Sequence, residues 1–244
     1  MKQTGNAAII VAAGSGQRMK TNMPKQFLEL ANRPILHYTL RPFIQCQDID
    51  KIFVVVPKLF KKTCEDEIIA PLLKERSFDE SNKSKIFCIN GGDSRQESVY
   101  AGLQAIDGFS DIVAIHDGVR PFITPGQISL IIRQAREKKA VIFGIKPRDT
   151  VKQVDHNNCI KKSIDRNSLL MAQTPQAFSY ALIRQAHECA MTSGLFATDD
   201  AMLMEWMGEK VYILPGHTLN IKITTPEDLI FSKNILTIWP PENQ

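Results

Sequence analysis

Short apolar runs recur from the N-terminus to residue 145, and this repetition limits the possible folds more than any other feature of the sequence. The runs are 7–12, 52–56, 86–89, 112–115 and 141–145. Such runs are typical of strands that are buried on both faces. Helical patterns lie between them, at 35–44, 58–74 (with Pro71 as a kink or end), 94–105 and from Thr124-Pro125 onward. The alternation predicts an α/β, Rossmann-like fold, in which helices cover both faces of a mostly parallel twisted sheet.

The regular alternation stops at about 146–165. The segments 150–154 and 160–164 flank a turn-rich tetrad, Asp155-His156-Asn157-Asn158, which predicts a β-hairpin arm. An isolated hairpin with few apolar residues is marginally stable, so we expect the arm to pack on another surface, such as a second protomer. Further on we expect helices at 180–191, 199–207 and from Thr225-Pro226, and strands at 211–214 and 221–223. We therefore expect one domain over 1–238 and a loose tail over 239–244.

The composition narrows the class of protein. The 244 residues are 43% hydrophobic and 23% charged, which is ordinary for a soluble globular domain. The net charge of +4 comes without a dense Lys/Arg run, so we expect no nucleic-acid partner, although a small anionic ligand is compatible. The five scattered cysteines form no C-x-x-C motif, which argues against disulfides and a zinc site. Because no apolar stretch is long enough to span a membrane, we expect a cytoplasmic protein.

The glycine-containing loop after the first strand, Ala12 to Gly16, matches neither standard nucleotide fingerprint. A dinucleotide fold requires a third glycine where Met19 stands, and the P-loop pattern is absent. The backbone N–H groups of such a loop can still bind phosphate, but an ordinary tight turn explains the glycines equally well. Arg18 and Lys25 favour phosphate, because phosphoryl transfer depends on positioned positive charges.

Several motifs in order along the chain resemble those of one enzyme family. The loop G-x-G-x-R-M followed by P-K-Q-F resembles the nucleotidyltransferases that activate phosphorylated polyols with CTP, most closely the 2-C-methyl-D-erythritol 4-phosphate cytidylyltransferases of the non-mevalonate isoprenoid route. The other matching segments are Gly91-Gly92-Asp93-Ser94-Arg95 with Ser98, His116 to Pro121, Arg148-Asp149-Thr150, Asp165-Arg166, Gln173 to Gln176, Thr198-Asp199-Asp200 and Asn220-Ile221-Lys222. The resemblance covers nearly the whole chain and implies a homodimer, whose hairpin arm crosses to the partner.

The resemblance implies a nucleotide site for CTP. Arg18 and Lys25 would stabilise the pentacoordinate α-phosphorus as catalytic residues. Asp93 is also placed where a helix N-cap is expected, which is an alternative to a role in binding. The residues implied to bind the nucleotide are Ala12, Ala13, Gly14, Ser15 and Gly16 around the triphosphate, and Gly92, Asp93 and Ser98 at cytosine and ribose.

Asp117 follows a predicted buried strand at its carboxyl end and is the best-placed carboxylate for Mg²⁺, the expected cofactor, which commonly uses one or two carboxylates and substrate oxygens. A turn aspartate before Gly118 is the alternative. We expect His116 to be packed and hydrogen-bonded, because an attacking phosphate is already ionised and needs no general base.

The acceptor is implied to be a phosphorylated polyol, bound and positioned by Arg166 and Lys222, which are implied to be catalytic residues too. The resemblance adds Asp117, Arg120, Thr150, Thr174 and Thr198 as substrate-binding residues, with Thr150 and Arg166 completing the site of the other protomer. A solvated strand residue is the alternative for Lys222.

Two acceptors stay open at this point. His116 to Pro121 reads H-D-G-V-R-P instead of the family's H-D-A-A-R-P. The valine at position 119 makes this motif similar to that of the ribitol 5-phosphate cytidylyltransferase branch. Residues 165–169 and Thr198-Asp199 are more similar to the methylerythritol branch. The expected reaction makes 4-diphosphocytidyl-2-C-methyl-D-erythritol and pyrophosphate; other sugar phosphates, a non-catalytic nucleotide-binding protein and an NAD-dependent oxidoreductase are the alternatives.

Overall fold

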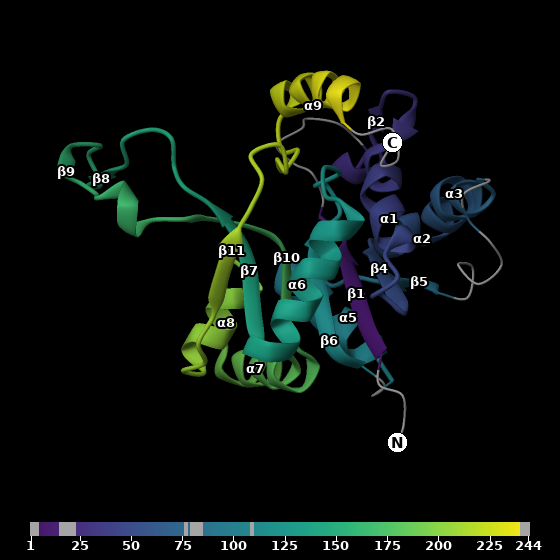
Figure 1. The fold of residues 1–244 in the computed structure, drawn as a ribbon, viewed down its shortest axis with the longest axis horizontal. Coiled ribbons are helices and arrows are strands. Elements are labelled where there is room, and N and C mark those ends of the chain that lie inside the picture. Colours follow the sequence, from purple (N-terminus) through teal and green to yellow (C-terminus); the bar gives the residue numbers. More distant parts are fainter. Residues whose placement is uncertain (1–4, 15–22, 76–77, 79–84, 108–109, 240–244) are drawn as a thin grey trace.

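The computed structural model describes residues 5–14, 23–75, 78, 85–107 and 110–239. A seven-stranded sheet with the order β11-β7-β10-β6-β1-β4-β5 forms its centre (Figure 1). All neighbouring strands are parallel except β10, which runs antiparallel to both β6 and β7. The mostly parallel α/β sheet is therefore confirmed. The strands are β1 (Gly5–Val11), β4 (Lys51–Val56), β5 (Ile86–Asn90), β6 (Ser110–Asp117), β7 (Ala140–Ile145), β10 (Met171–Ser179) and β11 (Tyr212–Pro215).

Helices cover both faces of the sheet, as the alternation predicts. One face packs against α1 (Ile35–Gln45), α6 (Pro125–Lys138) and the irregular helical segment 58–73. The other face packs against α5 (Arg95–Ala105), α7 (Tyr180–Ser193) and α8 (Asp200–Trp206). The segment 58–73 consists of η3 (Lys58–Phe60), α2 (Lys61–Thr63), the π-helix η4 (Cys64–Ile69) and α3 (Ala70–Leu73).

The two faces are separated by the period-two pattern of the strands. In β1, Ala8 and Ile10 belong to the core on the α1 and α6 side, whereas Ala7 and Ile9 belong to the core on the α5 and α7 side. All four residues are fully buried. This explains why the sequence of β1 is continuously apolar instead of alternating.

The predicted helix starts are confirmed in detail. Thr124 and Thr225 each form a capping box, with proline at the start of α6 and of α9 (Pro226–Ile238). Ser94 caps α5 in the same way, so the N-cap alternative for Asp93 is not realised. A third apolar cluster lies between α9 and the α1 side of the sheet and includes Val119 and Ile223.

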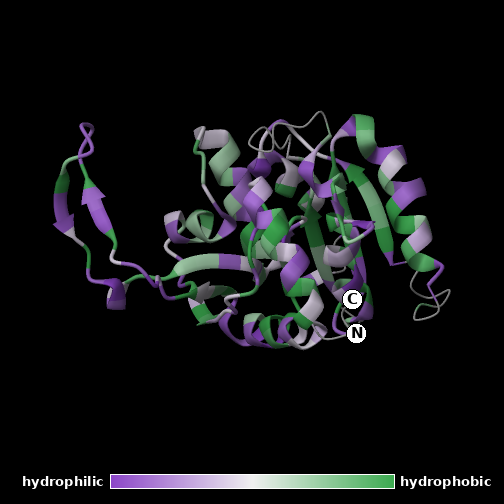
Figure 2. Ribbon diagram, turned by 90° about the horizontal axis from the view of Figure 1, so that it is seen from above, coloured by the Kyte–Doolittle hydropathy of each residue, from purple (hydrophilic) through white to green (hydrophobic). Residues whose placement is uncertain are grey.

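The hairpin arm is a separate two-stranded sheet of β8 (Lys152–Val154) and β9 (Ile160–Ser163) that projects from the body of the protein (Figure 1). Every residue of these two strands is exposed, and the arm is largely hydrophilic (Figure 2). The remaining short elements are η2 (Lys25–Phe27), β2 (Glu29–Leu30), β3 (Arg33–Pro34) and η5 (Arg166–Ser168).

Two expectations are corrected and one strand was missed. Residues 221–223 are not a strand, because Ile223 makes one backbone bond, to Val119 O at 2.9 Å, and joins no ladder. The long strand β10 was not predicted from the sequence. Trp239 is buried against Phe122, so it belongs to the packed domain rather than to a loose tail; residues 240–244 lie outside the described part of the chain.

No helix among the described residues is both long and apolar enough to cross a membrane.

Candidate active site

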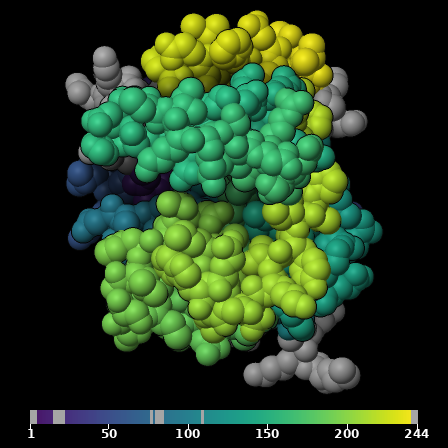
Figure 3. Space-filling model, turned by 90° about the vertical axis from the view of Figure 1, so that its left-hand side faces the viewer, coloured from purple at the N-terminus to yellow at the C-terminus, as the bar shows by residue number. Residues whose placement is uncertain are grey.

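A cavity of ≈ 520 Å³ lies where the loops after β1, β4, β5 and β6 meet. In a parallel sheet this edge, outside the carboxyl ends of the strands, is where ligands bind. A hollow lies beneath the arm, with N-terminal residues visible at its floor (Figure 3). The predicted site residues that line the cavity are Ala12, Ala13, Gly14, Lys25, Gly92, Asp93, Ser98, Asp117 and Lys222. Three more, Ser15, Gly16 and Arg18, lie outside the described residues.

The loops at this edge are packed too closely for side chains at two glycines. A Cβ on Gly91 would collide with Ala13 Cβ, and one on Gly118 would lie 2.9 Å from Ala12 Cβ. The backbone of Gly118 also donates to Val11 O at 2.8 Å. The glycines therefore allow the loop 12–14, which follows β1, to contact the loops that follow β5 and β6.

Lys25 reaches the loop 12–14 because its neighbour Gln26 is bound to it. Gln26 is buried, and its Nε2 donates to Ala12 O and, at 3.4 Å, to Gly14 O. The short η2 turn then places Lys25 in the wall of the same cavity. This arrangement accounts for the proximity of the P-K-Q-F segment to the glycines in sequence.

Asp117 is the electrostatic centre of the site. It ends β6, is only 5% exposed, and pairs with three cations. Its Oδ1 lies 3.3 Å from Arg95 Nε, and its Oδ2 lies 3.3 Å from Arg120 Nε and 2.9 Å from Lys222 Nζ. Burial alone would raise the pKa of Asp117, but the nearby Arg95, Lys222 and Arg120 hold that pKa well below its usual range. The carboxylate is therefore ionised at neutral pH.

Lys222 is aimed at Asp117 by the chain on its C-terminal side. Ile223 is buried in the apolar cluster with Val119, and its N–H donates to Val119 O at 2.9 Å. This anchor holds residues 220–223 against the loop after β6. Lys222 is thus a cavity residue, not the solvated strand residue of the alternative reading.

His116 is a structural neighbour of the site rather than a base. Its Nε2 lies 3.0 Å from Arg120 O, so this nitrogen carries the proton and donates. Thr174 Oγ1 then donates to His116 Nδ1 at 3.0 Å and accepts from Asp117 N at 3.1 Å. Burial lowers the pKa of His116 to about 4, which keeps it neutral. The expected packed and hydrogen-bonded histidine is confirmed.

The remaining predicted acceptor residues lie outside the cavity lining. Arg120 is behind Asp117 and donates to Asn220 O at 2.8 Å. Thr198 precedes α8, and its hydroxyl contacts Met202 Sδ at 3.8 Å. Thr150 and Arg166 are exposed on the arm, where Arg166 Nη1 donates to Arg148 O at 3.0 Å. The structure of the single chain does not bring these two arm residues to Asp117.

Arg95 was matched only as part of the family segment 91–95, without a role of its own, and Lys58 was not a candidate, yet both line the cavity. Asp200 and Asp117 raise the pKa of Arg95 against the lowering effect of burial, so Arg95 is always charged. A signal for both was available, because Lys58 follows β4 and Arg95 begins the helix after β5, at the sheet edge where the site was expected. With Lys25 and Lys222 they make the described wall strongly cationic, facing the acids Asp93 and Asp117.

The described residues contain no group of three or more His, Cys, Asp or Glu side chains that could hold a metal. Both oxygens of Asp117 already pair with cations, so a metal bound there would meet the positive charges of Arg95, Arg120 and Lys222. A metal held mainly by phosphate oxygens fits this donor set better than one held by the protein.

A mostly parallel sheet with a cation-lined cavity at the carboxyl ends of its strands defines an α/β protein that binds a phosphorylated nucleotide. Comparison with known proteins specifies the class further. Residues 6–238 match the family model described as 2-C-methyl-D-erythritol 4-phosphate cytidylyltransferase, and the chain belongs to this family.

Individual relatives agree. A protein of this description from Clostridium botulinum (strain Eklund 17B / Type B) is 43% identical over 230 residues, which cover 94% of this chain and 98% of the relative. The crystal structure of 4-diphosphocytidyl-2C-methyl-D-erythritol synthase from Anaerococcus prevotii is 35% identical, with a TM-score of 0.81 and coverage of 96% and 97%. The cytidylyltransferase structure from Francisella tularensis is 31% identical, with a TM-score of 0.75 and coverage of 94% and 98%.

Proposed function

We propose that this protein transfers CMP from CTP to 2-C-methyl-D-erythritol 4-phosphate, giving 4-diphosphocytidyl-2-C-methyl-D-erythritol and pyrophosphate. The observation that carries the proposal is the joint placement of Lys25, Asp117 and Lys222 in one cavity beside the loop 12–14, in a chain of this family.

The chemistry is one in-line displacement. An oxygen of the acceptor phosphate forms a bond to the α-phosphorus of CTP, and the bond from that phosphorus to the bridging oxygen breaks as pyrophosphate leaves. Lys25 supplies positive charge beside the loop that would hold the triphosphate, where negative charge develops in the transition state. Arg18, which lies outside the described residues, is proposed as the second such charge.

Asp117 and Lys222 would receive the acceptor. Asp117 holds Lys222 Nζ at 2.9 Å and so fixes the ammonium group at the cavity wall, ready to bind the acceptor phosphate. No proton has to be removed from an ionised phosphate, which agrees with the neutral, fully bonded His116.

We propose Mg²⁺ as the cofactor, entering with the phosphate oxygens of CTP. A bound Mg²⁺ would neutralise phosphate charge. The oxygens of Asp117 are paired with Arg95, Arg120 and Lys222, and the role of Asp117 as a metal ligand stays a prediction.

We further propose a homodimer in which the arm of one protomer supplies Thr150 and Arg166 to the site of the other. The arm supports this, since it projects from the body and exposes Val154 (47%) and Ile160 (64%), which is unfavourable unless another surface covers them. We place the enzyme in the cytoplasm, where CTP is available and the five unpaired cysteines stay reduced.

Pyrophosphate release tests the function. Each of the four ribonucleoside triphosphates is incubated with 2-C-methyl-D-erythritol 4-phosphate, with and without Mg²⁺. We expect release with CTP that depends on the acceptor and on Mg²⁺. If none of the four triphosphates gives pyrophosphate release, or if all four give equal release, the proposal is contradicted.

A further inference from the structure

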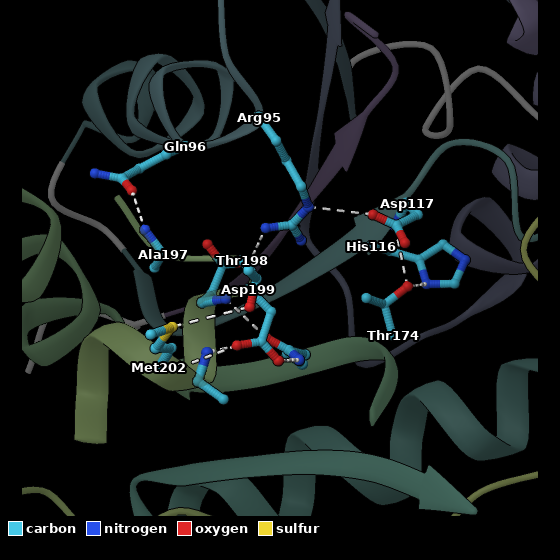
Figure 4. A network of polar contacts seen from close by, with 12 residues as sticks. Arg95, Gln96, His116, Asp117, Thr174, Ala197, Thr198, Asp199 and Met202 are labelled. Carbon is cyan, nitrogen blue, oxygen red and sulfur yellow. Dashed lines mark hydrogen bonds and ion pairs between the residues drawn. The ribbon is translucent and has the colours of Figure 1, made fainter. Parts of the chain in front are cut away.

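The cavity residue Arg95 bridges two carboxylates that lie on different sides of it. Its Nε is 3.3 Å from Asp117 Oδ1 at the cavity (Figure 4). Its Nη1 is 2.8 Å from Asp200 Oδ2 in the protein interior. Two anchors on one planar guanidinium fix both its position and its rotation. Asp200 is 1% exposed and lines no part of the cavity, so it acts on a ligand only through Arg95.

Asp200 is itself firmly held. His187, which is fully buried, places Nε2 3.1 Å from Asp200 Oδ1. The backbone N–H groups of Asp200 and Ala201 both donate to Gln176 Oε1 at 3.1 Å. The carboxylate that anchors Arg95 therefore cannot move without breaking several buried contacts.

Both carboxylates depend on the same strand. Gln176 of β10 holds the backbone of Asp200, and Thr174 of β10 accepts the backbone N–H of Asp117. The two carboxylates that hold Arg95 are thus both tied to one strand. The first turn of α5 is tied to the chain before α8 a second time, since Gln96 Oε1 accepts from Ala197 N at 2.9 Å and Gln96 Nε2 donates to Leu195 O at 3.1 Å.

A buried ion pair is not explained by stability, because well-packed apolar residues of similar volume often serve as well or better. The Arg95 and Asp200 pair has one end in the wall of the nucleotide cavity, directly after the loop Gly91 to Ser94. We propose that Asp200, supported by His187, is a positioning residue that holds Arg95 in the nucleotide cavity and through it orients Asp117.

This inference rests on the proposed function for its substrates, and direct binding of CTP separates the two. Calorimetry measures the dissociation constant of Mg·CTP for the wild type, Asp200→Asn, Arg95→Lys and the double variant. Asp200→Asn keeps the shape of the side chain but removes its charge. We expect each single variant to weaken CTP binding about 10-fold, the usual effect of losing a charged contact. The double variant should bind CTP no more weakly than the weaker-binding single variant, because both substitutions break the same ion pair between Arg95 and Asp200.

The kinetic constants distinguish positioning from a general loss of folded protein. Circular dichroism and thermal unfolding first establish a temperature at which every variant is folded. At that temperature KM for CTP should rise about 10-fold in Asp200→Asn, whereas partial unfolding would lower kcat and leave KM unchanged. Glu188→Gln, which removes the exposed pair between Arg184 and Glu188 on α7, is the matched control and should change neither constant.

If Asp200→Asn does not fold, His187→Gln tests the same chain of contacts from one residue further away and should also raise KM for CTP. Wild-type CTP affinity in a folded Asp200→Asn, or additive losses in the double variant, overturn the inference while leaving the proposed transfer intact. A wild type that binds CTP but transfers no CMP contradicts the proposed function alone, and a wild type that binds no CTP contradicts both.

Discussion

Lys222 Nζ lies 2.9 Å from Asp117 Oδ2, although the two residues come from opposite halves of the chain. The contact forms because Ile223 anchors its segment to Val119, just beyond Asp117. Lys222→Ala should lower kcat/KM for the acceptor about 100-fold, since a preorganised charge at the reacting phosphate is lost. Lys222→Arg should retain part of the activity. Lys233→Ala, at an exposed lysine of α9, is the control, and an equal loss in both alanine variants would refute the assignment.

Lys25→Ala should lose at least ~100-fold in kcat while its thermal unfolding stays close to that of the wild type. The reason is that the ammonium group adds charge at the transition state, whereas the half-buried Lys25 side chain is not part of the apolar core. Pyrophosphate release measures the rate, and Lys62→Ala on α2 controls for a change in surface charge. Near-normal turnover of Lys25→Ala would rule out its catalytic role.

The proposed exchange of arms between protomers predicts complementation between two inactive variants. In a mixture of Lys25→Ala and Arg166→Ala protomers, one site of each mixed dimer contains neither substitution. After denaturation and refolding together, random pairing should restore about a quarter of the wild-type rate. If each site is built within one protomer, no activity returns.

The proposed dimer should depend on the exposed apolar residues of the arm. Ile160→Asp places a charge on a strand where 64% of the isoleucine is exposed in one protomer. If a partner covers this surface, the charge is desolvated and the protein shifts toward the monomer. Sedimentation velocity measures the shift, with Lys161→Asp on the same strand as the control. An unchanged dimer in Ile160→Asp would exclude the arm as the interface.

Buried neutral histidines predict how stability depends on pH. The pKa of His116 is lowered from 6.5 to about 4 by burial, as is that of His37. The unfolded chain therefore gains protons below pH 6.5 that the folded protein takes up only near pH 4, and stability falls over this window. For His116 the loss at pH 5 relative to pH 8 is about 2 kcal/mol. Urea unfolding at both pH values should show a smaller difference in His116→Gln, and an unchanged one in His156→Gln on the arm.

Most of the layered fold was predictable from local patterns. The apolar runs of β1, β4, β6 and β7 and the capping residues Thr124 and Thr225 each carry their signal within a few residues of sequence. β10 was missed because residues 171–179 mix polar and apolar side chains and contain Pro175, and only pairing with β6 and β7 makes this segment a strand. Residues 221–223 were misassigned for the opposite reason, since their β-branched residues pack in a cluster without a neighbouring strand.

The site was predictable where a motif is contiguous. The loop 12–14 and Lys25 share a cavity because Gln26, between them in space, is buried against the loop. The position of Arg95 at the sheet edge had a signal in the sequence, but its pairing with Asp117 and Asp200 did not, since only the tertiary fold brings these carboxylates to its two sides. Thr150 and Arg166 stay predictions, because their place in a site depends on a second protomer.

Measuring which acceptor the enzyme prefers tests the proposed function most directly. The ratio of kcat/KM for 2-C-methyl-D-erythritol 4-phosphate to that for ribitol 5-phosphate is measured with CTP and Mg²⁺, and mass spectrometry identifies the product. We predict a ratio of at least ~100 in favour of the methylerythritol substrate, the discrimination expected of a site built to bind one polyol. A ratio near or below one, or no cytidine diphosphate product from the methylerythritol substrate, would contradict the proposed function.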